Sequence, residues 1–282
     1  MMIKPKWILC LSAALIASAG MLAPAQELTR EGPVPTTALV GVQSKQTAQL
    51  DPALLQLQVN GRATPIRSVQ MVRPGTAQIA ILIDDGLRES FSLQLADVQS
   101  FIRQLPANTK VLVGYMSNGT VRSAGHFSTE HESVAAGLRI PLSSPGVSAS
   151  PYFCLSDFVQ HWPSSEPGPR FVLMITNGVD PYNGSTSIMN QDSPYVRRAQ
   201  NDAQRAGVAV YSIYFGGEGV RGSRASFSGQ SYLQQVAEAT GGELLNQGPI
   251  SPVSLAPLLV RFQRDLAESY VRPGAPLLLF KG

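Results

Sequence analysis

Two adjacent carboxylates, Asp84 and Asp85, follow an aliphatic run in the stretch QIAILIDDG. A run of this kind is typical of a strand that is buried on both faces and delivers the residues after it to a surface. Paired acids at such a place suit a hard divalent ion such as Mg²⁺, which prefers oxygen ligands. Hydroxyl side chains are missing directly beside these acids. The stretch alone therefore leaves three hypotheses open: a metal site, a catalytic site, and the remnant of one.

Near-continuous apolar runs predict the strands that position these acids. They cover residues 78–83, 111–116, 171–176 and 208–215. Helical periodicity or helix-capping residues mark the segments 91–105, 152–162, 193–207, 231–240 and 255–270, and a capping-box pattern of Thr129 with Glu132 predicts one more short helix. This alternation predicts a doubly wound α/β domain over residues 76–271, with a mostly parallel sheet and helices on both faces.

A short connection predicts one antiparallel strand. Only the residues SNG separate the run that ends at Met116 from the stretch TVRSAGHF at 120–127. A parallel partner would need a crossover of about a dozen residues, so 120–127 must run antiparallel, at an edge of the sheet. This path returns the loop 143–150 to the side of Asp84, on the face where open α/β sheets bind ligands. The segment 176–180 should end on the same face.

The first 25 residues predict a cleaved signal peptide. Lys4 and Lys6 precede an apolar run from Trp7 to Ala17, and Ala23 to Ala25 form the small-x-small pattern that a signal peptidase reads. The run is too short for a membrane span. We expect an exported protein, periplasmic or secreted, that is not inserted into a membrane. Its remaining charge is nearly balanced, which argues against a nucleic-acid partner.

The segment between the signal peptide and the domain has a different pattern of apolar residues. Residues 26–75 contain short apolar alternations on either side of Asn60-Gly61, a pair that favours a tight β-hairpin. We predict a small β-rich segment here, and a C-terminal tail at residues 272–282.

In their order along the chain and in their residue patterns, these segments resemble a von Willebrand factor A domain, more specifically the related proteins that bacteria export. The resemblance covers about Thr76 to Tyr270. It depends on the stretches ILIDDG, VLVGYMSNGTVR, MITNGVD, AQRAGVAVYSIYF and YLQQVAEATGGEL. It implies a metal-ion-dependent adhesion site made of Asp-x-Ser-x-Ser after the first strand, a threonine from a later loop, and an aspartate after the fourth strand.

This chain departs from that pattern at several positions. Asp84 keeps the first position, but Gly86 and Arg88 replace the two serines and Asn177 replaces the later aspartate. Ser148 or Ser150 could supply the hydroxyl of the threonine. Fewer oxygen ligands and the fixed charge of an arginine predict weak or absent Mg²⁺ binding, hence no cofactor. Two interpretations of the acids stay open: Arg88 pairs with Asp84 or Asp85, or the acids are solvated.

We therefore expect a non-enzymatic protein-binding or adhesion module. Its partner would be a protein in the cell envelope or outside the cell, contacted through the long loops 180–194 and 216–230. Candidate contact residues are Tyr182, Met189, Arg221, Arg224 and Phe227. One alternative is Mg²⁺-dependent adhesion that uses Asp84, Asp85, a loop serine and Asp180. Another is a Mg²⁺-dependent phosphoryl-transfer or hydrolytic enzyme at the same acids.

The residues 217–222 match the pattern Gly-x-Gly-x-x-Gly after a strand, which raises the possibility of a dinucleotide site. Because the next helix is predicted to begin only near Ser231, the last glycine should not open it. We interpret the stretch as a flexible loop.

Overall fold

The computed structural model describes residues 37–40, 56–59, 62–64, 68–71, 77–123, 125–144, 147–183, 192–216, 222–248, 251–271 and 278–281. The predicted signal peptide lies outside these residues. In the described part of the chain, no helix is long and apolar enough to cross a membrane.

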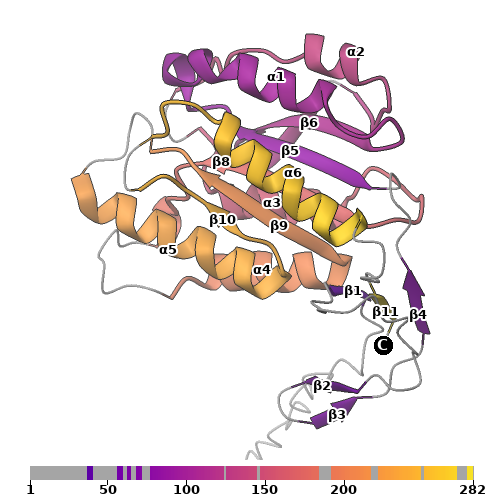
Figure 1. Cartoon of the computed structure of the whole chain (residues 1–282). Coiled ribbons are helices and arrows are strands. Elements are labelled where there is room, and N and C mark those ends of the chain that lie inside the picture. The colour runs from indigo at the N-terminus through magenta and orange to yellow at the C-terminus, as the bar shows by residue number, and fades with distance from the viewer. Residues whose placement is uncertain are drawn as a thin grey trace, which may run out of the picture. The chain divides into compact units, whose positions relative to one another are not determined.

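Six strands form the main sheet, in the order β10-β9-β8-β5-β6-β7 (Figure 1). Their bounds are β5 Gln78–Asp84, β6 Lys110–Ser117, β7 Thr120–Ser123, β8 Arg170–Thr176, β9 Val208–Tyr214 and β10 Leu244–Leu245. All neighbours pair in parallel except β6 and β7. The predicted antiparallel edge strand and the doubly wound fold are confirmed.

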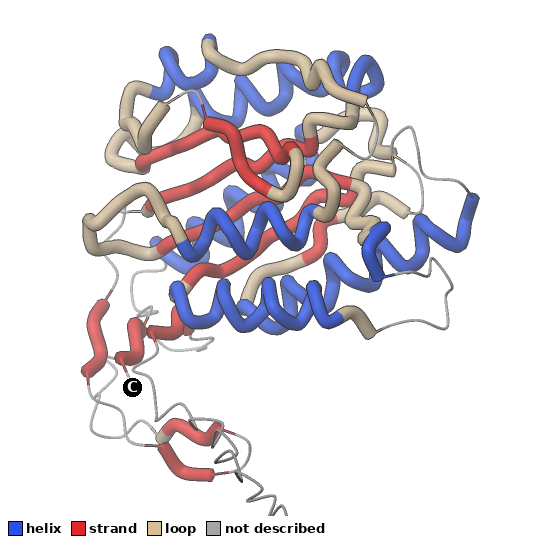
Figure 2. Tube along the Cα trace, turned by 180° about the vertical axis from the view of Figure 1, so that it is seen from behind, coloured by secondary structure: helices blue, strands red, loops and turns tan. Residues whose placement is uncertain are grey.

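Helices cover both faces of this sheet (Figures 1 and 2). Their bounds are α1 Leu95–Arg103, α2 His131–Ala136, α3 Pro151–Gln160, α4 Pro194–Ala206, α5 Gly222–Thr240 and α6 Ala256–Val271, with two 3-10 helices, η2 Arg88–Gln94 and η3 Pro181–Asn183. One apolar core joins the sheet to α1, α2 and α6, and the other joins it to α3, α4 and α5.

Burial of the central strand β5 on both of its faces fixes the position of its last residue. Ile79, Ile81 and Ile83 belong to one core, while Ala80 and Leu82 belong to the other. Each fully buried large aliphatic side chain contributes roughly 1.5–3 kcal/mol. A shift of one residue would exchange the two sets of side chains, so the register is strongly specified. Asp84, the last residue of β5, is therefore fixed at the carboxyl end of the sheet.

Local sequence signals set both ends of α4 as predicted. The Ser193 hydroxyl accepts hydrogen bonds from the backbone N–H groups of Tyr195 and Val196, and Pro194 occupies the first helical turn. Gly207 ends the helix in the left-handed conformation, with φ of 65°.

The start of α5 corrects the prediction. The helix begins at Gly222, not near Ser231, so much of the predicted loop 216–230 is helical. The reason given for dismissing the glycine motif was therefore wrong, because Gly222 does open a helix. The other motif residues, 217–221, lie outside the described residues. Tertiary packing explains the earlier start, since Ser228 is buried and Gly229 lies against Asn177.

Smaller corrections concern the ends of other elements. The strand expected at 120–127 ends at Ser123. The predicted capping box is not formed: Glu130 caps α2 without a side-chain hydrogen bond, and Glu132 pairs with Arg103 at 2.8 Å instead. The two-residue strand β10 was not predicted at all, because so short a run has no periodicity to detect.

The N-terminal segment contributes strands to two small antiparallel sheets. β2 Leu57–Val59 pairs with β3 Arg62–Thr64, which confirms the hairpin predicted from Asn60-Gly61. The other sheet has the order β1-β11-β4, from Thr37–Val40, Leu278–Lys281 and Ser68–Met71. The residues predicted as a tail thus include a strand that pairs with both β1 and β4.

Candidate functional site

The candidate site lies where the parallel strands end. We define the rim as the residues that surround this end of the sheet: 84–87, 91–94, 139–144, 147–150, 177–183, 227–230 and 251–254. Several contacts join these segments. Gln94 donates to the carbonyl of Val253 at 2.8 Å, the Asp85 carboxylate accepts from Ser143, and Gly229 lies against the backbone of Asn177.

Asp84 is the buried centre of the rim, with 3% of its surface exposed. Its Oδ1 accepts from the backbone N–H of Gly86 at 3.0 Å. Its Oδ2 accepts from the hydroxyls of Ser148 and Thr176 at 3.1 and 2.9 Å. Burial raises the pKa of Asp84, and these hydrogen bonds only partly oppose that effect. The carboxylate is thus occupied by donors of the protein itself.

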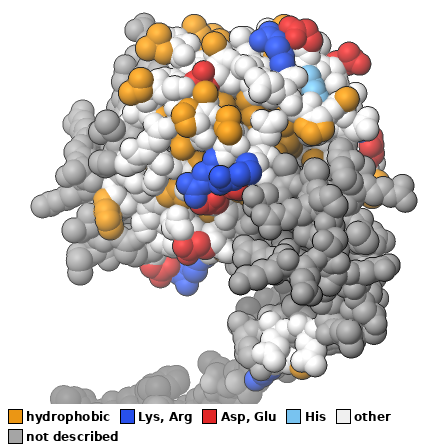
Figure 3. All heavy atoms as spheres, viewed as in Figure 1, with side chains coloured by type: hydrophobic (Ala, Val, Ile, Leu, Met, Phe, Trp, Pro, Cys, Tyr) orange, Lys and Arg blue, Asp and Glu red, His pale blue; other side chains and the backbone are white. Residues whose placement is uncertain are grey.

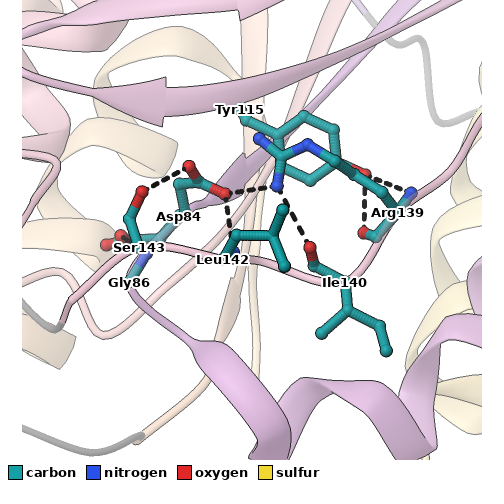
Figure 4. A network of polar contacts seen from close by, with 8 residues as sticks. Asp84, Gly86, Tyr115, Arg139, Ile140, Leu142 and Ser143 are labelled. Carbon is teal, nitrogen blue, oxygen red and sulfur yellow. Dashed lines mark hydrogen bonds and ion pairs between the residues drawn. The ribbon is translucent and has the colours of Figure 1, made fainter.

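Asp85 points to different partners. Its Oδ1 accepts from Arg139 Nη1 at 2.7 Å and from the backbone N–H of Leu142 at 3.3 Å, and its Oδ2 accepts from the Ser143 hydroxyl at 2.7 Å. The three donating residues, Arg139, Leu142 and Ser143, are labelled in Figure 4. Burial alone would raise the pKa of Asp85, but the hydrogen bonds from Arg139, Ser143 and Leu142 outweigh it and lower the pKa. Asp85 therefore attaches the segment 139–143 to the end of β5.

Arg139 is itself held in place by Tyr115, as Figure 4 shows. The guanidinium carbon lies 3.8 Å from the centroid of the tyrosine ring. The Tyr115 hydroxyl donates to the carbonyl of Arg139 at 2.7 Å and accepts from its N–H at 2.8 Å. The predicted pairing partner was Arg88, whose side chain lies outside the described residues. The structure assigns this role toward Asp85 to Arg139.

The other predicted site residues have separate local tasks. The Asn177 side chain accepts from the N–H of Val179 at 2.9 Å, which forms an Asx turn. Asp180 accepts from the Ser193 hydroxyl at 2.9 Å and from the N–H of Tyr182 at 3.2 Å. Ser150 caps α3. Of the eight predicted positions, the structure thus joins Asp84, Gly86 and Ser148 by hydrogen bonds.

Sequence reasoning missed Thr176 and Arg139. Thr176 had a detectable signal, because it ends the strand that pairs with β5 in parallel and so must lie beside Asp84. Arg139 had none, since 54 residues separate it from Asp85 along the chain.

The three carboxylates that the sequence suggested as Mg²⁺ ligands have separate hydrogen-bond partners. Asp84, Asp85 and Asp180 each accept hydrogen bonds from a different set of donors. Within the described ranges, no group of three or more His, Cys, Asp or Glu side chains is placed to hold a metal ion. Mg²⁺ prefers a nearly octahedral set of oxygen ligands. Among the described residues, the hydroxyls of Ser148 and Thr176 are the oxygen groups that contact the Asp84 carboxylate.

The mostly parallel sheet, its single antiparallel edge strand and an aspartate at the end of the central strand β5 agree with the fold of the family that the sequence resembles. The domain has a von Willebrand factor A-like fold. No family model matches the sequence, and no curated protein matches it either.

Solved structures show likeness in fold to this von Willebrand factor A-like domain. An aerotolerance-related membrane protein from Bacteroides fragilis NCTC 9343, solved with multiple mutations to serines, is 10% identical over 68% of this chain and 99% of that chain, with a TM-score of 0.48. BatB from Bacteroides thetaiotaomicron is 13% identical over 68% and 97%, with a TM-score of 0.47. The SpRpn10 VWA domain is 13% identical over 66% and 95%, with a TM-score of 0.43. Likeness at this level concerns the fold alone.

The surface of the rim is apolar. Among the described residues, seven large hydrophobic side chains are exposed, and all but Val260 belong to the rim. The six are Leu93, Ile140, Leu142, Tyr182, Phe227 and Val253. Scattered single hydrophobic residues are normal on a surface, but a gathering of them marks an interaction site.

Aromatic rings extend the rim toward α3 and α4. The ring of Phe153 lies 5.3 Å from that of Tyr182 and 4.8 Å from that of Tyr195. Tyr182, a predicted contact residue, is 57% exposed. Phe227, the other contact residue whose side chain is described, is on helix α5 and not on a loop. Met189, Arg221 and the side chain of Arg224 lie outside the described residues.

Proposed function

We propose that this chain is an exported protein-binding module that contacts a protein partner through the rim, without a metal ion and without catalysing a reaction. One observation supports it most: six of the seven exposed large hydrophobic side chains in the described part of the chain belong to the rim. Interfaces are rich in aromatic residues and poor in charge at their centre. The rim has that composition.

The internal pairing of the rim acids supports binding without a metal. A metal-dependent adhesion domain needs a carboxylate that faces an ion with an open position for the partner. Here both hydroxyls next to Asp84 donate to that carboxylate, and Arg139 neutralises Asp85. In our proposal, Arg139 performs the loop-fixing task that an ion would perform.

Binding of a partner without catalysis is supported by the same geometry. The carboxyls of Asp84 and Asp180 are almost fully buried and accept three and two hydrogen bonds, respectively. A general acid or base must reach the substrate within hydrogen-bonding distance. Export is supported by the pattern of the first 25 residues, and it places the partner in the cell envelope or outside the cell.

The test compares capture of envelope proteins by the mature chain and two variants. Leu93→Ser with Leu142→Ser removes two of the most exposed rim side chains, and Val260→Ser removes an exposed side chain on α6 as the matched control. Truncating side chains central to an interface costs about 1 kcal/mol or more each. We expect the rim variant to lose a protein that the wild type and the control both retain.

A chelator arm separates the alternatives. Capture that survives EDTA agrees with binding through apolar contacts. Loss of capture with EDTA, restored by Mg²⁺, would support the alternative of Mg²⁺-dependent adhesion and contradict the proposal. Equal capture by the rim variant and the wild type would also contradict it.

A further inference from the structure

A polar cleft lies at the C-terminal ends of helices α3 and α4. It has a volume of about 730 Å³ and is lined by residues that include Trp162, Arg170, Arg205 and Ala206. A second hollow of about 550 Å³ continues along α4 past Arg197 and Arg198. The two share Gln160, Asp202 and Arg205, so they form one groove between the helices, which we call the α3–α4 groove.

The charge that faces this groove is positive. Four arginines line it, and Asp202 is the one acidic lining residue. Asp202 is buried, with 8% of its surface exposed. The side chains of Ser156 and Gln160, on α3, both donate hydrogen bonds to its Oδ2. The same Oδ2 lies 3.6 Å from Nε of Arg198, so this carboxylate offsets part of the positive charge of the four arginines.

Arg170 is oriented by neutral groups. It donates to the carbonyl oxygens of Ala206 and Ser164, both at 3.4 Å, and its guanidinium carbon lies 5.4 Å from the Trp162 ring. Partial burial lowers the pKa of Arg170. A guanidinium that stays charged while it is partly desolvated gains more from a bound anion than one in open solvent.

The basic side chains of α6 also lie beside carboxylates. Arg261 pairs with Glu243, and Arg264 lies 3.7 Å from Asp265. Figure 3 shows basic and acidic side chains directly beside one another on the face that bears α6. In the groove, Arg197 and Arg198 likewise lie close to carboxylates, Asp192 at 3.2 Å and Asp202 at 3.6 Å, so the α6 arginines offer a control with comparable pairing.

The spacing of the polar side chains along α4 indicates the conformation of a ligand that would fit the groove. Arg197, Asn201 and Arg205 are four residues apart and line the groove on one side of the helix. Successive residues of this row are separated by about 6 Å along the helix axis. Alternate side chains of an extended peptide lie about 6.6 Å apart. An extended chain with acidic side chains at alternate positions therefore matches the row.

We propose that the α3–α4 groove binds an extended acidic segment of a protein, with carboxylates on Arg197, Arg205 and Arg170. The uncharged Asn201 in the middle of the row and the Asp192 carboxylate, 3.2 Å from Arg197, disfavour a uniform polyanion. The Trp162 ring lines the groove near Arg170 and gives this end of the groove an apolar surface for one hydrophobic side chain of the segment. This inference does not depend on the function proposed for the rim.

The test measures binding of a fluorescently labelled decapeptide of alternating glutamate and alanine to the full chain by anisotropy. A peptide with glutamine in place of glutamate is the neutral control. We expect saturable binding of the acidic peptide that weakens with salt, and binding at least about tenfold weaker for the neutral one, since hydrogen bonds between charged groups are the strong ones.

Two double variants with the same change in net charge decide the location. Arg197→Gln with Arg205→Gln should weaken binding about tenfold. Arg103→Gln with Arg261→Gln, on α1 and α6, should leave it unchanged. The single variant Arg197→Gln, at an exposed position, keeps the test valid if the double variant does not fold.

The proposal would be overturned by the absence of saturable binding of the acidic peptide, by equal weakening in both double variants, or by tighter binding of short-chain polyphosphate than of the peptide. The last result would identify the groove as a general polyanion site. Retained binding in the groove variants counts against the proposal in the same way.

Discussion

Asp84 and Asp85 are neighbours in sequence but have opposite environments. Burial raises the pKa of Asp84, whereas the partners of Asp85, Arg139 above all, lower its pKa against the effect of burial. The stability due to Asp84 is complete below its ordinary pKa of 3.8 and is lost as the pH rises through the raised value. The stability due to Asp85 is complete above 3.8 and is lost as the pH falls through the lowered value.

A double-mutant cycle on Asp85→Asn and Arg139→Gln measures the first of our predictions. The Asp85 side chain is 8% exposed and that of Arg139 is 39% exposed, so solvent screens the pair only in part. We expect a coupling free energy of about 1 kcal/mol at pH 7 in urea unfolding, which then declines as the pH falls below 3.8.

The exposed pair Arg103 and Glu132 provides the control cycle. Its N–O distance of 2.8 Å is close to that of the rim pair, but its side chains are 42% and 76% exposed. Solvent screening should reduce its coupling to about 0.5 kcal/mol or less. Equal coupling in the two cycles would show that Asp85 and Arg139 form an ordinary surface pair.

At the scale of elements, the rim depends on how closely α5 approaches β8. A Cβ atom on Gly229 would lie 2.2 Å from the carbonyl oxygen of Asn177, and one on Gly178 would lie 2.5 Å from the carbonyl oxygen of Gly229. Two glycines thus let the backbones of α5 and the loop after β8 touch. This contact holds the first half of α5 against the rim, although that half has weak helical signals of its own.

Gly229→Ala should therefore destabilise the domain by about 1–3 kcal/mol, despite the higher helix propensity of alanine. Gly137→Ala is the matched control, because the added Cβ would meet no atom nearer than 3.5 Å and φ is −75° there. It should be neutral or slightly stabilising. Unfolding free energies of the two variants that agree within error would show that α5 does not pack closely on the rim.

At the scale of the molecule, the two proposed surfaces differ in kind. The rim exposes apolar and aromatic side chains, while its acids face inward. The α3–α4 groove exposes arginines and begins beside the rim at Pro194. A single partner could contact both surfaces, with an apolar part on the rim and an acidic extension in the groove.

Magnesium should leave the stability of the whole chain unchanged. A ligand stabilises the folded state by RT ln(1 + [L]/Kd), so millimolar Mg²⁺ without a specific site should shift the melting temperature by about 1 °C or less. Calorimetry of the wild type and of Asp84→Asn, each with Mg²⁺ and with EDTA, checks this. A clear rise with Mg²⁺ in the wild type that Asp84→Asn abolishes would restore the metal site.

The sequence by itself determined the architecture of the domain. Its strands are apolar almost throughout because both faces of the sheet are covered, and a three-residue connection to Thr120 is too short for anything except an antiparallel return. Ser193 and Gly207 set the ends of α4 through local backbone chemistry. The position of Asp84 at the end of the sheet followed from the same patterns. Each of these features depends on residues close together along the chain, so it can be predicted from the local sequence.

Only the tertiary structure decided what surrounds the acids. It brought Arg139 and Tyr115 to Asp85, placed Ser148 rather than Ser150 on Asp84, and extended α5 back to Gly222. It also joined α3 and α4 into a groove lined by arginines that the sequence had not singled out. The physical reason is that each of these contacts depends on residues far apart along the chain. No local periodicity encodes which of the distant side chains will meet, because packing of the two cores fixes those distances.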